Sequence, residues 1–192
     1  MEKIILASGS PRRKHLLELA EIPFEVKVSD IDESYPEGLS PAEIAIHIAS
    51  NKARAIQEKI DMGKNSPLMI LAADTVVVLD NEIIGKPLNR QNAIEILSRL
   101  SGRIHKVITG VCILNGFEEK IFAEETEVKF RELSLAQIEY YIDNYQPYDK
   151  AGAYAIQEWI GAVGIKSIKG DFYNVMGLPV SKVVQELATQ QN

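Results

Sequence analysis

Two arginines follow a turn of small residues at the point where the sequence predicts a helix to begin. The stretch SGSPRR, residues 8–13, comes directly after the apolar run KIILA. The first N–H groups of a helix lack partners and lie at the positive end of its dipole, so such a helix start binds anions. The hydroxyl groups of Ser8 and Ser10 add donors, whereas Arg12 and Arg13 carry charge that the dipole disfavours. A bound phosphate chain accounts for this pattern, and so does a solvated basic surface on a capped helix.

One lysine interrupts the apolar side of another predicted helix. Lys52 falls at the four-residue spacing that is kept by Ile44, Ile48, Ile56 and Ile60. It therefore stands within the apolar stripe of the helix and not on its polar face. A lysine in that place either extends its ammonium group into solvent or meets an anion, and the sequence leaves both readings open.

A carboxylate stands in the middle of the most apolar strand. Asp74 lies within MILAADTVVVLD, where a buried carboxylate costs several kcal/mol unless it is paired, hydrogen-bonded or bound to a metal. The alternative is a carboxylate that caps a neighbouring loop. The acidic loop DIDES supplies Asp30, Asp32 and Glu33, and one of them, together with Asp74, has the chemistry that Mg²⁺ requires. Solvation of an ordinary acidic loop is the competing reading.

Two further stretches contribute polar groups beside small residues. IIGKPLN holds Lys86 between a glycine and a proline, and YDKAGAYAIQ supplies Asp149, Lys150 and Gln157. Small residues permit close approach of the backbone, although turns of this composition are also common on surfaces. Taken together, the candidate groups suit a polyphosphate that carries a divalent metal: the cations Arg12, Arg13, Lys52 and Lys86, and the carboxylates Glu33 and Asp74.

The composition limits the kinds of protein that the chain can be. With 192 residues, of which 46% are hydrophobic, it can bury a core, and we expect a single domain over residues 1–192. The net charge of −6 argues against a protein that clamps nucleic acid. Cys112 is the only cysteine, which excludes an internal disulfide and favours a reducing, cytoplasmic location. No segment approaches the roughly 20 apolar residues of a membrane span.

Periodicity and capping residues predict the elements that position these groups. Strands are expected over residues 3–7, 24–28, 69–80, 106–114 and 119–130, with a further strand pair over 162–168 and 172–176. Helices are expected over 11–20, 41–60, 90–101, 135–145 and 178–188, with N-caps at Ser10, Ser40, Asn89 and Ser134. Strand–helix units come first and hairpins later, which indicates an α/β fold around a mixed, twisted sheet flanked by helices.

These motifs resemble, in type and order, those of the Maf family of nucleoside triphosphate pyrophosphatases. The resemblance rests on SGSPRR, Glu33, Lys52 in NKA, AADTVV, GKP and DKAGAYAIQ, and extends from Leu6 to about Leu178. It implies an elongated, two-lobed fold with a central cleft, related to that of the inosine triphosphate pyrophosphatases. It also implies metal-dependent hydrolysis of a nucleoside triphosphate to the monophosphate and pyrophosphate, with Asp74 as the proton acceptor.

The resemblance extends to the choice of base. The group of the family that acts on dTTP and UTP has Arg, Thr and Gln at three specificity positions, which match Arg12, Thr75 and Gln157 here. The chain therefore resembles that group and not the group that acts on 7-methyl-GTP. Homodimers are common in the family, and a homodimer is an expectation for this chain. The family is also named for inhibition of septum formation.

The expected mechanism gives each candidate a role. Arg12, Arg13, Lys52 and Lys86 would neutralise the phosphates, Glu33 and Asp74 would hold Mg²⁺ or Mn²⁺, and Asp74 would activate the water that attacks the α-phosphorus. A nucleotide kinase or a monophosphatase is one rival, although no Walker-type phosphate loop is present. The other rival is a non-enzymatic nucleotide-binding regulator of septum formation, which needs the cations but not Asp74.

Overall fold

The protein forms two compact units. The computed structural model describes residues 3–60 and 69–189. Unit 1 comprises the chain as far as Thr75, the segment Thr109–Glu124 and the chain from Gly177 onward, whereas unit 2 comprises Val76–Ile108 and Glu125–Met176. The single domain expected over residues 1–192, the elongated shape and the central cleft stay predictions.

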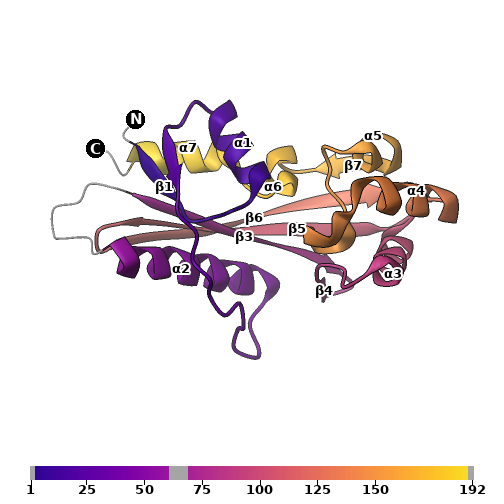
Figure 1. Cartoon of the computed structure of the whole chain (residues 1–192), viewed down its shortest axis with the longest axis horizontal. Coiled ribbons are helices and arrows are strands. Elements are labelled where there is room, and N and C mark those ends of the chain that lie inside the picture. Colours follow the sequence, from indigo (N-terminus) through magenta and orange to yellow (C-terminus); the bar gives the residue numbers. More distant parts are fainter. Residues whose placement is uncertain (1–2, 61–68, 190–192) are drawn as a thin grey trace. The chain divides into compact units, whose positions relative to one another are not determined.

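Unit 1 is built on a mixed sheet. Strand β1 (Ile4–Leu6) pairs in parallel with β2 (Phe24–Val26) and with β3 (Ile70–Leu79). The sheet continues through β5 (Ile104–Asn115) and β6 (Glu118–Phe130), in the order β2-β1-β3-β5-β6. The expected mixed α/β architecture is confirmed. Figure 1 shows that the sheet of unit 1 has helix α2 (Pro41–Ile60) on one side, with α1 (Pro11–Leu19) and α7 (Val180–Thr189) on the other.

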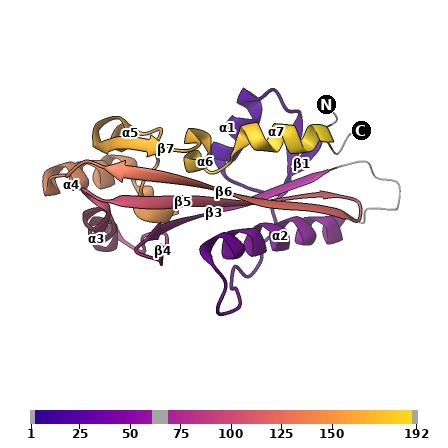
Figure 2. The ribbon, with the colours of Figure 1, turned by 180° about the vertical axis from the view of Figure 1, so that it is seen from behind.

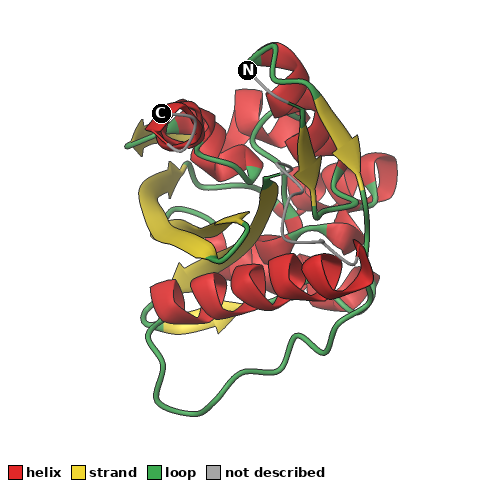
Figure 3. Cartoon of the chain, turned by 90° about the vertical axis from the view of Figure 1, so that its left-hand side faces the viewer, coloured by secondary structure: helices red, strands yellow, loops and turns green. Residues whose placement is uncertain are grey.

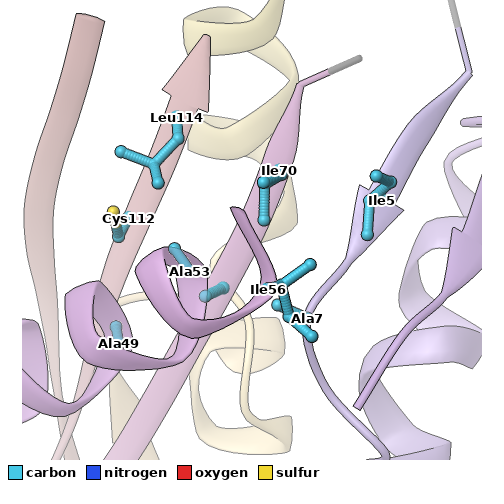
Figure 4. Packing of buried hydrophobic residues seen from close by; sticks show 9 residues of the cluster. Ile5, Ala7, Ala49, Ala53, Ile56, Ile70, Cys112 and Leu114 are labelled. Carbon is cyan, nitrogen blue, oxygen red and sulfur yellow. The ribbon is translucent and has the colours of Figure 1, made fainter. Parts of the chain in front are cut away.

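Helix α2 lies directly on the sheet because small residues line its inner face. Ala49 and Ala53 of α2 belong to a buried cluster with Ile70 of β3 and Cys112 of β5 (Figure 4). The approach is closest at Gly110, where a Cβ atom would lie 2.3 Å from the backbone of α2. This contact holds the helix that carries Lys52 at a fixed distance from the strands.

The expected N-caps Ser40, Asn89 and Ser134 each make a capping hydrogen bond, whereas the last helix begins at Val180 and not at Leu178. Ser40 and Glu43 form the predicted capping box, in which the Glu43 carboxylate accepts from the Ser40 N–H at 2.8 Å. The long green loop of Figure 3 leads from β2 into this cap. Ser10 stands at the N-cap position of α1, but its side chain makes no capping hydrogen bond. Helix α1 is held instead by the burial of Leu16 and Leu17 and by contacts of Arg13.

Unit 2 surrounds the remaining parts of β3, β5 and β6. The short strand β4 (Glu82–Ile84) pairs antiparallel with β3, and β7 (Ile165–Lys169) pairs antiparallel with β6. Helices α3 (Arg90–Leu100) and α4 (Leu135–Tyr145) pack against each other, as Figure 2 shows from behind. The 3-10 turns η1 (Pro147–Asp149) and η2 (Ala151–Ala153) lead to α5 (Trp159–Gly164).

The strand pair predicted over residues 162–168 and 172–176 is wrong. Residues 162–164 end α5, and β7 takes β6 as its partner. The stretch FYNVM is the helix α6 (Phe172–Met176), since the Asp171 carboxylate accepts from the Tyr173 N–H at 2.8 Å and so starts a helical turn. Its aromatic and β-branched composition misled the prediction.

No helix in the described ranges 3–60 and 69–189 combines the length and the apolar character that crossing a bilayer requires.

Candidate functional site

Arg13 is the most deeply buried charged residue among the described residues of unit 1. Its guanidinium donates from Nε to the Gly177 carbonyl at 2.8 Å, from Nη1 to Ser8 Oγ at 3.0 Å and from Nη2 to Thr75 Oγ1 at 3.1 Å. Its side chain comes from α1, and these acceptors come from three other segments of unit 1. Only 8% of the residue is exposed. The contacts fix the plane of the guanidinium, but every one of the acceptors is neutral.

None of these contacts therefore brings a negative charge to the Arg13 guanidinium. Within the part of the chain that the structure describes, Arg13 forms no ion pair. Burial lowers the pKa of its guanidinium, and the negative charge of Asp74 opposes that shift from a distance. A buried cation that lacks a paired anion is costly. An anionic ligand at this place would supply the missing charge.

The turn before α1 is folded around the Ser8 hydroxyl. Ser8 Oγ accepts from the Ser10 N–H at 3.3 Å as well as from Arg13. Both bonds use the oxygen as an acceptor, so the Ser8 proton remains able to donate to a ligand. Ser10 and Arg12 are half-buried, and the first turn of α1 contains no acidic residue. Contacts thus bring together Ser8, Ser10 and Arg13 of the predicted anion-binding stretch SGSPRR.

Lys52 meets anions, which decides between the two readings that its sequence position left open. Its Nζ atom lies 2.7 Å from Asp74 Oδ1 and 2.7 Å from Glu33 Oε1. The lysine comes from α2, Asp74 from the middle of β3 and Glu33 from the loop before α2. Asp74 is therefore a paired carboxylate and not a loop cap. Asp32 instead binds within its own loop, through the N–H and hydroxyl groups of Ser34.

Glu33 and Asp74 fit a metal that arrives with a phosphate. Their carboxylate oxygens converge on a single cation, the Lys52 ammonium. Among the described residues, no group of three or more His, Cys, Asp or Glu side chains is arranged to hold a metal ion. Mg²⁺ is typically held by one or two carboxylates together with substrate phosphates and water, and this is the donor set that Glu33 and Asp74 can begin.

The hydroxyl group of Thr75 has protein partners on two sides. It accepts from Arg13 and lies 2.9 Å from the hydroxyl of Thr109, which is fully buried. Sequence reasoning missed Thr109 and Gly177, the further neighbours of this group. The only sign of Thr109 in the sequence is a hydroxyl within the apolar run VITGV.

In unit 2, the two predicted stretches around Lys86 and Gln157 are joined through their glycines. The Gly152 N–H donates to the Gly85 carbonyl at 3.1 Å. Gly152 has a φ of +70°, and a Cβ atom there would lie 3.0 Å from the Val77 side chain, so this position requires glycine. Lys86 is exposed and forms no hydrogen bond or ion pair with any residue that the structure describes.

Gln157 is exposed on the turn Ala155–Glu158, which is closed by the Glu158 N–H donating to the Ala155 carbonyl at 3.1 Å. Nearby, the buried Lys150 lies 2.7 Å from Asp149 Oδ1 and 3.6 Å from Glu158 Oε1. Sequence reasoning singled out Lys150 but missed Glu158, which follows Gln157 directly and carries no motif signal of its own.

The predicted site residues are thus distributed over both units. Unit 1 contains Ser8, Ser10, Arg12, Arg13, Glu33, Lys52, Asp74 and Thr75, and unit 2 contains Lys86 and Gln157. Within unit 1, contacts join Ser8, Ser10, Arg13 and Thr75 in one group and Glu33, Lys52 and Asp74 in another. Adjacency along β3 connects the two groups at Asp74 and Thr75.

Comparison with known proteins identifies the family. The chain is 50% identical to a protein of Cytophaga hutchinsonii named dTTP/UTP pyrophosphatase, over 98% of this chain and 84% of that one. It is also 50% identical to a protein of the same name from Parabacteroides distasonis, over 96% of this chain and 94% of that one. Among solved structures, the alignment with the Staphylococcus aureus Ham1 protein covers 67% of this chain and 72% of that one, at 16% identity and a TM-score of 0.42. The model of the family described as Maf-like protein matches residues 3–190, and the chain belongs to that family.

Proposed function

We propose that this protein is a hydrolase that converts dTTP and UTP to the nucleoside monophosphate and pyrophosphate. The observation that carries the proposal is the buried Arg13, a cation held rigidly by neutral groups and lacking an anion. A triphosphate supplies that anion. The names of the relatives, dTTP/UTP pyrophosphatase, support the same substrate class.

The residues around the start of α1 bind the phosphate chain. The Ser8 hydroxyl donates its proton to a phosphate oxygen. Arg13 uses three of its N–H groups on Gly177, Ser8 and Thr75, and its remaining N–H groups donate to phosphate oxygens as well. Ser10 and Arg12 add a hydroxyl and a second positive charge in the first turn of the helix. Because the protein already holds Arg13 in place, little reorganisation accompanies binding.

Asp74 is the base that activates water. Lys52 holds Asp74 Oδ1 at 2.7 Å, so the other carboxylate oxygen is the one that accepts the proton of the attacking water. The water oxygen then forms a bond to the α-phosphorus, and the bond from that phosphorus to the bridging oxygen breaks. Pyrophosphate leaves with the electron pair, and the charge that develops is stabilised by Lys52, Arg13 and Lys86.

Dependence on a divalent metal, Mg²⁺ or Mn²⁺, is part of the proposal. Glu33 and Asp74 would hold the ion, because both carboxylates already face one cation. When bound, such an ion supplies charge neutralisation at the phosphate oxygens. We expect chelation to abolish turnover and either metal to restore it, whereas turnover that survives exhaustive chelation would remove the metal from the mechanism.

Gln157, Arg12 and Thr75 are proposed to set the base preference. A pyrimidine such as thymine or uracil offers a carbonyl–NH–carbonyl edge, and the Gln157 amide can both donate and accept against it. Thr75 is proposed to contribute in part through Arg13, whose Nη2 donates to its hydroxyl. A cytoplasmic location and a homodimer complete the proposal and stay predictions.

The deciding experiment is turnover of a nucleoside triphosphate panel with Mg²⁺ or Mn²⁺, with pyrophosphate and orthophosphate assayed separately. We expect pyrophosphate from dTTP and UTP and little from purine nucleotides. Orthophosphate as the product would mean attack at the terminal phosphorus and would contradict the mechanism. Tight binding without turnover would favour a non-enzymatic nucleotide-binding regulator, and in that case Asp74→Asn would leave binding intact.

A further inference from the structure

Gln157 occupies a turn that is fastened at both of its ends. The turn runs from Ala155 to Glu158, and its own hydrogen bond joins the Glu158 N–H to the Ala155 carbonyl at 3.1 Å. Ala155 and Ile156 are buried, whereas Gln157 is exposed. Exposed glutamine side chains on turns are ordinarily free to adopt many rotamers. A residue that selects a base needs a fixed backbone beneath it.

A single hydroxyl group bridges the ends of this turn. Tyr141 of helix α4 is fully buried, and its hydroxyl accepts from the Ala155 N–H at 3.1 Å. The same hydroxyl donates to the Glu158 carboxylate Oε2. The first and last residues of the turn are thus tied to one atom of a neighbouring helix. A buried hydroxyl that uses both its donor and its acceptor capacity in this way is fully satisfied.

Two further contacts restrain the turn from its other sides. The Lys150 ammonium lies 3.6 Å from Glu158 Oε1 and balances the carboxylate charge. At Gly161, a Cβ atom would lie 1.7 Å from the carbonyl oxygen of Ile156, so helix α5 packs backbone against backbone on the turn. Any shift of the turn breaks a hydrogen bond or meets this contact.

We propose that Tyr141 and Glu158 are positioning residues that set base selectivity by fixing the turn that carries Gln157. This inference rests on the proposed function, in which Gln157 reads the base. An amide distinguishes hydrogen-bonding patterns only when it is held near the productive geometry, to within about 0.5 Å. Loosening the turn therefore weakens discrimination between bases, while the groups of unit 1 that bind phosphate and activate water are unchanged.

The test compares two tyrosines of the same helix. Tyr141→Phe removes the bridging hydroxyl and keeps the ring. Tyr145→Phe is the matched control, since Tyr145 stacks on Tyr141 but has 36% of its surface exposed. We expect Tyr141→Phe to lower the ratio of kcat/KM for dTTP to that for dGTP roughly 5- to 10-fold, the size of one hydrogen bond. The loss should appear in the KM for dTTP and not in kcat, and Tyr145→Phe should leave the ratio unchanged.

Charge and hydrogen bonding at Glu158 are separated by two substitutions. Glu158→Gln keeps an acceptor for the Tyr141 hydroxyl, so we expect it to retain most of the selectivity. Glu158→Leu removes the acceptor and should match Tyr141→Phe. Gln157→Ala should also lower the ratio, and adding Tyr141→Phe to it should lower the ratio no further, because both act through one side chain.

Several results would overturn the inference. An equal loss of kcat/KM for all triphosphates in Tyr141→Phe would show a general structural role. If the losses of selectivity in Tyr141→Phe and Gln157→Ala multiplied in the double variant, the tyrosine would not act through the glutamine. Amide hydrogen exchange provides a readout that does not depend on activity. The Ala155 amide should lose protection in Tyr141→Phe, and unchanged protection would show that the Tyr141 hydroxyl does not hold the turn. If the wild type released no pyrophosphate from dTTP, the proposed function would fail. The exchange result would still decide whether the Tyr141 hydroxyl holds the turn.

Discussion

Each unit of the protein contains a largely buried lysine between two carboxylates. Lys52 in unit 1 lies 2.7 Å from both Glu33 and Asp74. Lys150 in unit 2 lies 2.7 Å from Asp149 but 3.6 Å from Glu158. The two clusters look alike in composition, yet their carboxylates come from different kinds of places in the chain.

The two clusters also differ in how their carboxylates are held. Asp74 sits within a core strand and is largely buried together with Lys52, which costs free energy unless the charges are paired, whereas Glu33 reaches the same lysine from a separate, exposed loop. Asp149 is the exposed neighbour of Lys150 in sequence, and Glu158 is also held by the Tyr141 hydroxyl. We infer that the first cluster exists for chemistry and that the second exists to fix a turn.

The largest expected effect comes from Asp74→Asn. The amide keeps the size of the side chain but cannot accept a proton from water, so kcat should fall roughly 10²- to 10⁴-fold, the usual contribution of a general base. The measurement is pyrophosphate release from dTTP at saturating substrate and metal. A variant that binds dTTP and turns it over at the wild-type rate would refute the role of Asp74 and would erase the contrast between the clusters.

Unit 2 contains a buried histidine that should make the stability of the protein depend on pH. His105 of unit 2 bonds through Nε2 to the Tyr154 hydroxyl at 2.7 Å, and its Nδ1 atom is buried without a partner among the described residues. Burial lowers the pKa of His105 from 6.5 to about 4. His105 therefore becomes protonated below pH 6.5 in the unfolded chain, but only below about pH 4 in the folded protein.

The free energy of unfolding should accordingly fall by about 3 kcal/mol as the pH drops through that range. Denaturant unfolding between pH 7 and pH 4 measures it, with His105→Gln as the comparison because glutamine does not titrate. The carboxylates respond to acid equally in the wild type and in His105→Gln. The difference between the two plots of unfolding free energy against pH therefore reports the titration of His105. Parallel slopes would show that His105 is not held neutral by the fold.

A smaller effect is expected from Thr75, which orients Arg13 through its hydroxyl. Thr75→Val keeps the shape of the side chain and removes the acceptor for Arg13 Nη2. We expect kcat/KM for dTTP to fall about 10-fold, the lower end for a hydrogen bond to a charged group. Thr75→Ser keeps the hydroxyl and should stay near the wild type; an equal loss in both variants would assign the effect to packing of the methyl group.

The smallest effect is expected in the second lysine cluster. Asp149→Asn removes the carboxylate nearest to Lys150, but the Asp149 side chain is 60% exposed and ion pairs at such places contribute little. Turnover of dTTP should change less than about threefold. A loss comparable to that of Asp74→Asn would mean that Lys150 and its partners take part in the reaction.

Local sequence signals predicted the elements well where caps and periodicity agree. Helix α2 has the bounds expected from its Ser40–Glu43 cap and its isoleucine stripe. The helix α6 escaped prediction because Asp171 starts it with one hydrogen bond, which outweighs the strand propensity of FYNVM. Short segments of this kind are decided by a single contact and not by composition.

The site was predictable as a set of residues but not as a set of contacts. A charge inside an apolar run marks Lys52 and Asp74, since burial without a partner is too costly to be accidental. A lone hydroxyl in an apolar run is a weak sign of Thr109, and nothing in the sequence marks Gly177; the tertiary fold positions both residues. The same holds for Tyr141, which reads as an ordinary residue of an amphipathic helix until its hydroxyl is seen to bridge a turn.

The bond between Arg13 and the Gly177 carbonyl has a consequence for the order in which the protein is made. The two residues are 164 positions apart, so the ribosome synthesises the arginine long before its partner. Until Gly177 has left the ribosome, Arg13 lacks one of the acceptors that hold its guanidinium in plane. A chain that stops before Gly177 therefore lacks one of the acceptors that orient Arg13, and the proposed phosphate-binding group is complete only after Gly177 has been made.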